Sequence, residues 1–172
     1  KFMHIGLIKF KERKFGQQWQ IANAVSVETK SQFGAEQKIV PVTPISILQR
    51  ELGVVALQDN YLLGYVGATY LNDKYAQIGT LLVSELYQGS GIGTKLVASI
   101  TEKLTQKDVR LFAFCNPNSM NSFENAGYTS ALDGEIPAPA KSRFNNHAMV
   151  FPVFSPESRN EIELVGAGVL GQ

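Results

Sequence analysis

The sequence is poor in the residues that make disulfides and metal sites. Its 172 residues include one cysteine and two histidines. A single cysteine excludes an internal disulfide and fits a reducing compartment, so we expect a cytoplasmic protein. Cys115 closes an apolar run that begins at Val109, which predicts a buried thiol and not a nucleophile. Neither His4 nor His147 has a partner at metal-ligand spacing, and no metal site is predicted.

Long hydrophobic runs and an excess of one charge are also missing. No apolar segment approaches the roughly 20 residues of a membrane span, and the N-terminus shows no signal-peptide pattern. Sixteen basic and 15 acidic residues leave a formal net charge of +1, which gives no general attraction to nucleic acids or anionic membranes. The basic cluster at residues 9–14 is interpreted as a solvated face. We therefore expect neither a nucleic-acid nor a membrane partner.

The composition that remains is that of an ordinary globular domain. Apolar residues make up 44% of the chain and charged residues 18%. A chain of this length can bury about 70% of its unfolded surface. No repeat, low-complexity tract or linker divides it, so residues 1–172 are predicted to form a single domain, in which 155–172 is either an extra strand or a tail. The sequence leaves open whether the chain forms a homodimer.

The most informative stretch runs from residue 76 to residue 94. It begins as an apolar, β-branched run that predicts a strand, and it continues into the turn Gln88-Gly-Ser-Gly-Ile-Gly93. Apolar residues at every fourth position then predict a helix: Ile92, Leu96, Ile100 and Leu104. A helix start offers unpaired N–H groups and a partial positive charge, and the turn's glycines allow a phosphate to approach the backbone. We therefore expect a phosphorylated cofactor here.

Spacing separates the families that bind phosphate at such a turn. A dinucleotide fingerprint counted from Gly89 requires glycine at position 94, where Thr94 stands. A Walker loop requires lysine directly after the last glycine, whereas Thr94 separates Gly93 from Lys95. Neither pattern fits, although a nucleotide-binding module that uses the same turn remains an alternative.

Two motifs resemble the GNAT N-acetyltransferase superfamily. The first is Gln88-x-x-Gly91-x-Gly93 between a strand and a helix, which is similar to the family's Arg/Gln-x-x-Gly-x-Gly/Ala motif. The second is the spacing of Asn116, Phe123 and Gly127-Tyr128, where many members carry Asn, Tyr and Gly-aromatic. The resemblance covers about residues 53–128. It implies an α/β (α+β) fold of the GNAT type, with a mixed, mostly antiparallel central sheet and helices on both faces.

The resemblance also implies a co-substrate, acetyl-CoA or another acyl-CoA. The pyrophosphate would lie on the N–H groups of residues 88–94, and the pantetheine arm would pair with the strand at 81–83. In the family a bulge separates this strand from the next, so that an N–H near Leu82 or Val83 stabilises the oxyanion. The implied cofactor-binding residues are Leu81, Leu82, Val83, Gln88, Gly89, Ser90, Gly91, Ile92, Gly93, Thr94, Asn116 and Phe123.

The implied function is direct transfer of an acetyl group to a primary amine, within a ternary complex, on an unidentified small-molecule or peptide acceptor. Two departures from the family pattern matter. Gln88 stands where arginine is usual, which removes a charge facing the phosphates. Phe123 stands where many members carry a proton-donating tyrosine, and it has no proton to give. These departures motivate an alternative, a catalytically weak or inactive CoA-binding sensor.

No catalytic residue is assigned from the sequence. Family members often use a glutamate on the central strand as general base, but residues 75–83 contain no carboxylate. The substitutes that the sequence offers are Tyr70, Asp73, Tyr75, Glu85 and His147, and for each of them a structural role is the simpler interpretation.

The remaining elements are predicted by pattern alone. Strands are expected at 2–10, 53–57, 62–71, 109–115 and 148–154, and helices at 16–33, 44–52 and within 116–127. The strands at 53–57, 62–71 and 76–83 should form an antiparallel meander. Because a long helix precedes it, the strand at 109–115 should lie parallel to its neighbour.

Overall fold

The structure is a computed structural model that describes residues 3–8, 15–34, 42–50, 52–59, 61–137, 140 and 146–152. The elements, in chain order, are β1 (His4–Ile8), α1 (Phe15–Gln32), α3 (Pro44–Leu48), β2 (Leu52–Gln58), β3 (Tyr61–Tyr70), β4 (Tyr75–Val83), the 3-10 helix η2 (Glu85–Tyr87), α4 (Ile92–Thr105), β5 (Arg110–Cys115), α5 (Pro117–Asn125), β6 (Thr129–Ser130) and β7 (His147–Val150).

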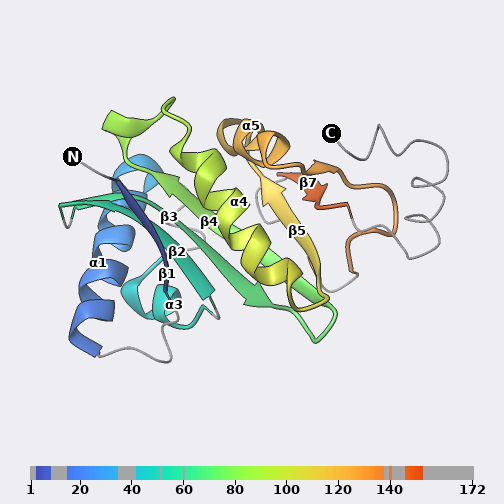
Figure 1. The fold of residues 1–172 in the computed structure, drawn as a ribbon, viewed down its shortest axis with the longest axis horizontal. Coiled ribbons are helices and arrows are strands. Elements are labelled where there is room, and N and C mark those ends of the chain that lie inside the picture. The colour runs from blue at the N-terminus through green and yellow to red at the C-terminus, as the bar shows by residue number, and fades with distance from the viewer. Residues whose placement is uncertain are drawn as a thin grey trace.

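Within the described ranges, seven strands form one sheet in the order β1-β2-β3-β4-β5-β7-β6. Every neighbouring pair is antiparallel except β4 and β5, which are parallel. The helix α4 makes the crossover between these two strands (Figure 1). The predicted meander, the parallel pair and the mostly antiparallel α/β sheet are therefore confirmed.

Helices cover both faces of the sheet, and each face has its own apolar core. The apolar stripe of α4 packs on one face, where Leu96, Ile100 and Leu104 are fully buried. The helices α1 and α3 pack on the other face through residues such as Val25 and Ile47. The helix stripe predicted from the four-residue spacing is confirmed, and it orients the start of α4 toward one end of the sheet (Figure 1).

Two elements end four residues before their predicted ends, at 48 and not 52 and at 150 and not 154. The helix expected to reach residue 52 ends at Leu48, because Leu52 already pairs with Ala68 as the first residue of β2. The last strand ends at Val150, two residues before Pro152, and it lies between β5 and β6. Pro152 therefore marks the end of that strand, which is not an edge strand. The predicted tail at 155–172 lies outside the described residues.

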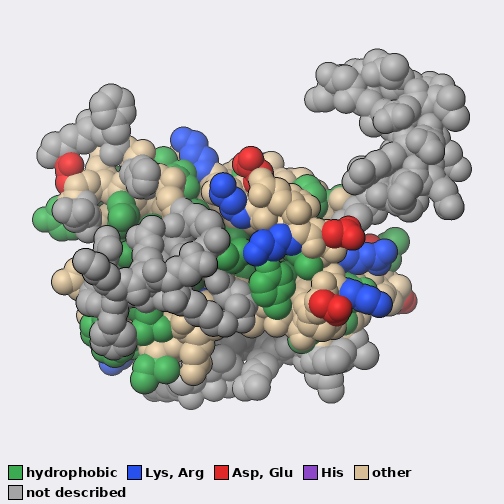
Figure 2. Space-filling model, turned by 60° about the horizontal axis from the view of Figure 1, so that its bottom comes forward, with side chains coloured by type: hydrophobic (Ala, Val, Ile, Leu, Met, Phe, Trp, Pro, Cys, Tyr) green, Lys and Arg blue, Asp and Glu red, His purple; other side chains and the backbone are tan. Residues whose placement is uncertain are grey.

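The described surface carries charges of both signs. On the face shown in Figure 2, lysine and arginine side chains lie among aspartates and glutamates and do not gather into one basic field. In the ranges that the structure describes, no helix is both long enough and apolar enough to cross a membrane.

Candidate active site

Strand β4 is irregular in its second half. In its pairing with β3, Gly79 lies opposite Gly67 and Leu82 opposite Tyr65, so that residues 80 and 81 share one position of the partner strand. This is a β-bulge. Thr80 adopts a φ of 58°, which is rare for a β-branched residue. The bulge that the family resemblance implied is therefore present, and it bends the strand at residue 80.

Beyond the bulge, β4 separates from β5. The parallel pairing runs from Tyr75 to Ile78 and then stops, so the β5-facing edge of residues 79–83 has no strand partner in the described parts of the chain. The Ser84 N–H donates to the Leu63 carbonyl at 2.8 Å. By the alternation of an antiparallel ladder, the main-chain groups of Leu82 then face β3 and those of Val83 face the gap.

The glycine-rich turn leads into an uncapped helix. Gly89 and Gly91 adopt φ values of 81° and 86°, and Gly91 is the N-cap of α4 without a side-chain hydrogen bond to the helix start. The first N–H groups of α4 are therefore available to an anion. Gly93 has a different role from the expected one. A Cβ there would lie 2.5 Å from the Ser122 Oγ, so this glycine allows α4 and α5 to pack closely.

A cleft of about 860 Å³ lies beside this turn and the end of β4. Nine of the predicted cofactor residues line it: Leu81, Val83, Gln88, Gly89, Gly91, Ile92, Gly93, Thr94 and Asn116. Ser90 does not line it, and its hydroxyl donates instead to the Tyr87 carbonyl. Leu82 and Phe123 line a second cavity. The sequence-predicted residues are thus brought together, apart from these three.

The side chain of Gln88 does not face the open turn. Its amide donates to the Val83 carbonyl at 3.1 Å and to the Gln32 Oε1 at 3.1 Å. Gln32, at the end of α1, donates to the same carbonyl at 2.8 Å. Sequence reasoning missed Gln32, which has no motif of its own. The two glutamines close over the free edge of β4.

Helix α5 contributes a polar face that sequence reasoning also missed. Asn116 caps the helix by accepting from the Ser119 N–H at 2.9 Å. The cleft is lined by Asn116 and by the α5 residues Asn118, Ser119, Asn121, Ser122 and Asn125. These α5 residues alternate with the apolar set Met120, Phe123 and Ala126, so the amphipathic pattern was a usable signal.

A second cavity of about 210 Å³ lies on the other side of the gap. It is lined by residues that include Arg50, Thr80 and Leu82. It shares four lining residues with the cleft: Phe33, Leu81, Asn116 and Ser119. The cleft and the cavity therefore meet where β4 and β5 separate.

Phe123 and Cys115, which the sequence analysis singled out, are both buried. Phe123 is 3% exposed and packs edge-on against Tyr128, with ring centroids 5.1 Å apart. The Tyr128 hydroxyl pairs with Thr101 at 2.7 Å, and burial raises its pKa far above the usual range. Burial, the largest cause, also raises the pKa of the Cys115 thiol to about 12. The prediction of a buried thiol is confirmed.

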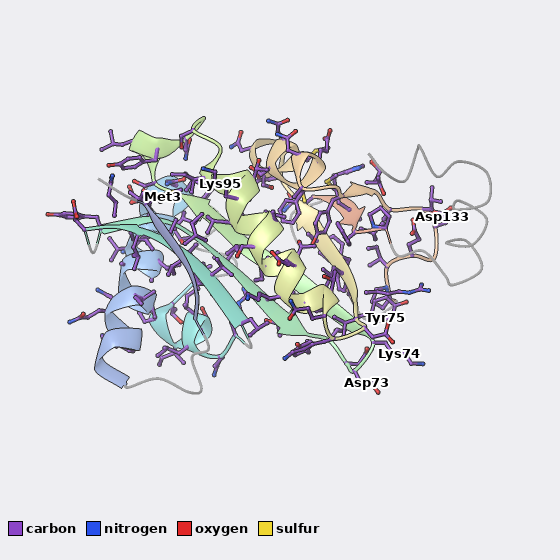
Figure 3. All side chains as sticks on the ribbon, viewed as in Figure 1. Met3, Asp73, Lys74, Tyr75, Lys95 and Asp133 are labelled. Atoms are coloured by element: carbon purple, nitrogen blue, oxygen red, sulfur yellow. The ribbon has the colours of Figure 1, made fainter. Side chains whose placement is uncertain are left out.

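Three of the five candidate bases lie at the wrong end of the sheet. From residue 75 to residue 82, β4 extends about 23 Å at the usual rise per residue. Figure 3 shows Asp73 and Tyr75 at one end of the sheet and Lys95, near the start of α4, toward the other. Tyr70 pairs with Ala76 at the same distant end. None of these three borders the cleft or the small cavity.

The other two candidates are nearer to the gap. Glu85 lines the cleft. His147 pairs with Cys115 in the sheet, but its Nε2 lies 2.7 Å from the Ser130 Oγ and its side chain lines neither space. Within the described residues, no group of three or more His, Cys, Asp or Glu side chains is placed to hold a metal ion.

An uncapped helix start therefore lies beside a strand that leaves its parallel neighbour, and such a helix start is suited to a phosphate group. A family model described as acetyltransferase (GNAT) family matches residues 19–128. The chain belongs to this family, whose co-substrate is acetyl-CoA. Membership supports acetyl transfer from an acyl-CoA as the general activity.

Solved structures share the fold at low sequence identity. Tetrahymena GCN5 aligns with 88% of this chain and 98% of its own, at 12% identity and a TM-score of 0.67. An acyl-CoA N-acyltransferase from Pseudomonas aeruginosa aligns with 88% of this chain and 100% of its own, at 13% identity and a TM-score of 0.64. The third is N-acetylglutamate synthase from Neisseria gonorrhoeae, complexed with coenzyme A and N-acetyl-glutamate. It aligns with 90% of this chain and 36% of its own, at 20% identity and a TM-score of 0.61. No curated protein sequence matches the chain.

Proposed function

We propose that the protein is an N-acetyltransferase that moves the acetyl group of acetyl-CoA directly to a primary amine in a ternary complex. The observation that carries the proposal is the meeting of the cleft and the small cavity at the gap between β4 and β5. Leu81 and Asn116 border both spaces. A co-substrate and an acceptor that enter from opposite sides would bring thioester and amine together there.

The geometry of the cleft supports the following placement of the co-substrate. The diphosphate would lie against the N–H groups at the start of α4, where no side chain competes. The pantetheine arm would run along the free edge of β4, and the amide of Asn116 would donate to it from the opposite side. Val83, whose main chain faces the gap, would supply the N–H that stabilises the oxyanion. Such a donor typically contributes about 3–4 kcal/mol to the transition state.

The transfer itself needs little from the protein's ionisable groups. The amine nitrogen attacks the thioester carbon, the carbon–sulfur bond breaks, and the proton of the amine passes to water. CoA can leave as a thiolate, because an ordinary thiol has a pKa of about 8.5. Phe123 therefore slows the reaction less than the loss of a general acid would for a more basic leaving group.

A CoA-binding sensor with weak or no activity is the second candidate. It is favoured by Phe123 and by the lining of the small cavity, which holds neither a carboxylate nor a histidine among the described residues. Thiol release from acetyl-CoA with a panel of amines, followed by mass spectrometry of the products, separates the two. Acetylated amine with matching thiol release supports the transferase. Retained CoA in native mass spectrometry, with no turnover on any amine, supports the sensor.

A further inference from the structure

Arg50 occupies a special position in the small cavity. It follows α3, and its guanidinium lies across β3 and β4 at the bulge. One terminal nitrogen donates to the Thr69 Oγ1 at 3.2 Å and the other donates to the Thr80 Oγ1 at 2.9 Å. The guanidinium also lies over Gly79, where a Cβ would be 3.6 Å from it. The guanidinium group of Arg50 is therefore held in place at the point where β4 leaves β5.

The charge of Arg50 is not neutralised by a described neighbour. No carboxylate lines the small cavity or forms an ion pair with Arg50 in the parts of the chain that the structure describes. Its two hydrogen bonds go to neutral hydroxyl groups and use two of the five N–H donors of an arginine. A half-buried cation with spare N–H donors beside a cavity favours an anionic ligand.

A nearby tyrosine reports the same positive charge. Burial raises the pKa of Tyr65 far above its usual range, and the charge of Arg50 partly offsets this rise. Tyr65 lies in the core between the sheet and α1 and α3. Arg50 therefore lies near the apolar core on this face of the sheet, which the small cavity borders through Leu82.

We propose that the acceptor is a small primary amine that carries a carboxylate, as an amino acid does, and that Arg50 binds this carboxylate. The inference rests on the proposed transferase function. The small cavity, at about 210 Å³, lies below the roughly 300–1,000 Å³ of pockets for drug-sized ligands. A planar guanidinium held at two points matches the two oxygens of a carboxylate.

The same charge would select against other amines. An acceptor that brings only positive charge, such as an aliphatic diamine, meets a like charge in the cavity, and this repulsion acts as discrimination. In a carboxylate-bearing acceptor the anion offsets the repulsion.

The test compares acceptors that differ only in the carboxylate. Amino acids, their carboxamides and aliphatic diamines are offered with acetyl-CoA to the full chain with its own sequence and to the same chain carrying Arg50→Gln. We expect the full chain to favour an amino acid over its carboxamide by about 10- to 100-fold in kcat/KM, as a charge-assisted hydrogen bond predicts. Arg50→Gln should lose this preference and retain CoA binding, measured by calorimetry. Arg110→Gln, which removes an exposed arginine at the start of β5, should behave as the full chain does.

The outcomes distinguish the two proposals. Equal or faster acetylation of carboxamides or diamines would overturn the carboxylate proposal and leave the transferase intact. If no amine is acetylated, the transferase proposal fails. The melting temperature of the CoA complex, measured with and without each acceptor, then tests whether Arg50 binds a carboxylate. A rise in melting temperature with an amino acid, absent for the carboxamide and absent in Arg50→Gln, would still support an anion site at Arg50. No rise with any amino acid would overturn that site as well.

Discussion

Replacing Gly91 by alanine tests whether the start of α4 binds the diphosphate of CoA. Gly91 has a φ of 86°, and a Cβ built there has no atom within 4 Å. The methyl group therefore meets no protein atom, but it stands in the cleft at the helix N-cap. An alanine in the left-handed region costs about 1–2 kcal/mol. For a chain of this size that lowers the melting temperature by about 2–8 °C.

The effect on CoA binding should exceed the effect on stability. A charge-assisted hydrogen bond to a phosphate contributes about 1.5–3 kcal/mol. If the methyl group keeps the diphosphate from one N–H at the helix start, the dissociation constant of CoA should rise by about 10- to 150-fold. Isothermal titration calorimetry with CoA measures this constant directly, without any need for an acceptor.

Gly134 provides a matched control for the backbone. It has a φ of 84°, and a Cβ there also has no atom within 4 Å, but it lies outside the cleft. Gly134→Ala should lower the melting temperature by a similar amount and leave CoA binding unchanged. A dissociation constant for Gly91→Ala within twofold of the unmodified chain, or an equal loss in Gly134→Ala, would refute the reasoning.

Two further predictions concern buried residues beside the gap. Phe123→Tyr should raise kcat about tenfold in the thiol-release assay, less than the 10²–10⁴ typical of general acids, because thiolate is already a fair leaving group; an unchanged kcat in a variant that melts normally would contradict this. Burial raises the pKa of the Cys115 thiol from about 9.0 to about 12, so the stability that the protonated thiol contributes should be present in full below pH 9 and be lost as pH rises through about 12. Between pH 9 and pH 12 the melting temperature of the unmodified protein should fall more steeply than that of Cys115→Ala. Parallel curves of melting temperature against pH would disprove this prediction.

The backbone features of the site could be predicted from sequence because they are local. A left-handed glycine, a helix stripe and a strand of β-branched residues each leave a pattern within about 20 residues. The glycine turn at Gly91, the helix at 92–105 and the parallel pairing of β5 followed from such patterns. The end of α3 did not, because the pairing of Leu52 with Ala68 in the sheet overrides the local helix signal.

The side chains that complete the site could not be predicted, because only the folded chain brings them there. Arg50 meets Thr80 across 30 residues of sequence, and Gln32 meets Val83 across 51. A single polar residue carries no periodicity or spacing that would mark it. The direction of the Gln88 side chain is likewise set by a partner on α1. The motif located the residue, while the tertiary structure determined its contacts.

The pair of glutamines leads to a last prediction, in which a residue at the site opposes binding. Gln32 and Gln88 both donate to the Val83 carbonyl, at 2.8 and 3.1 Å. This carbonyl lies on the edge that the pantetheine arm would use, so binding must displace these donors. A hydrogen bond of this kind contributes about 0.5–1.5 kcal/mol. Gln32→Ala should therefore lower the free energy of unfolding by about that amount and tighten CoA binding by about 2- to 10-fold.

The control for this change is Gln106→Ala, which truncates an exposed glutamine at the other end of α4. It should leave the dissociation constant of CoA unchanged. Weaker binding of CoA by Gln32→Ala would mean that the Gln32 amide turns to hold the co-substrate and does not compete with it. Calorimetry and chemical denaturation of the same two variants separate these cases, because only competition lowers stability and raises affinity together.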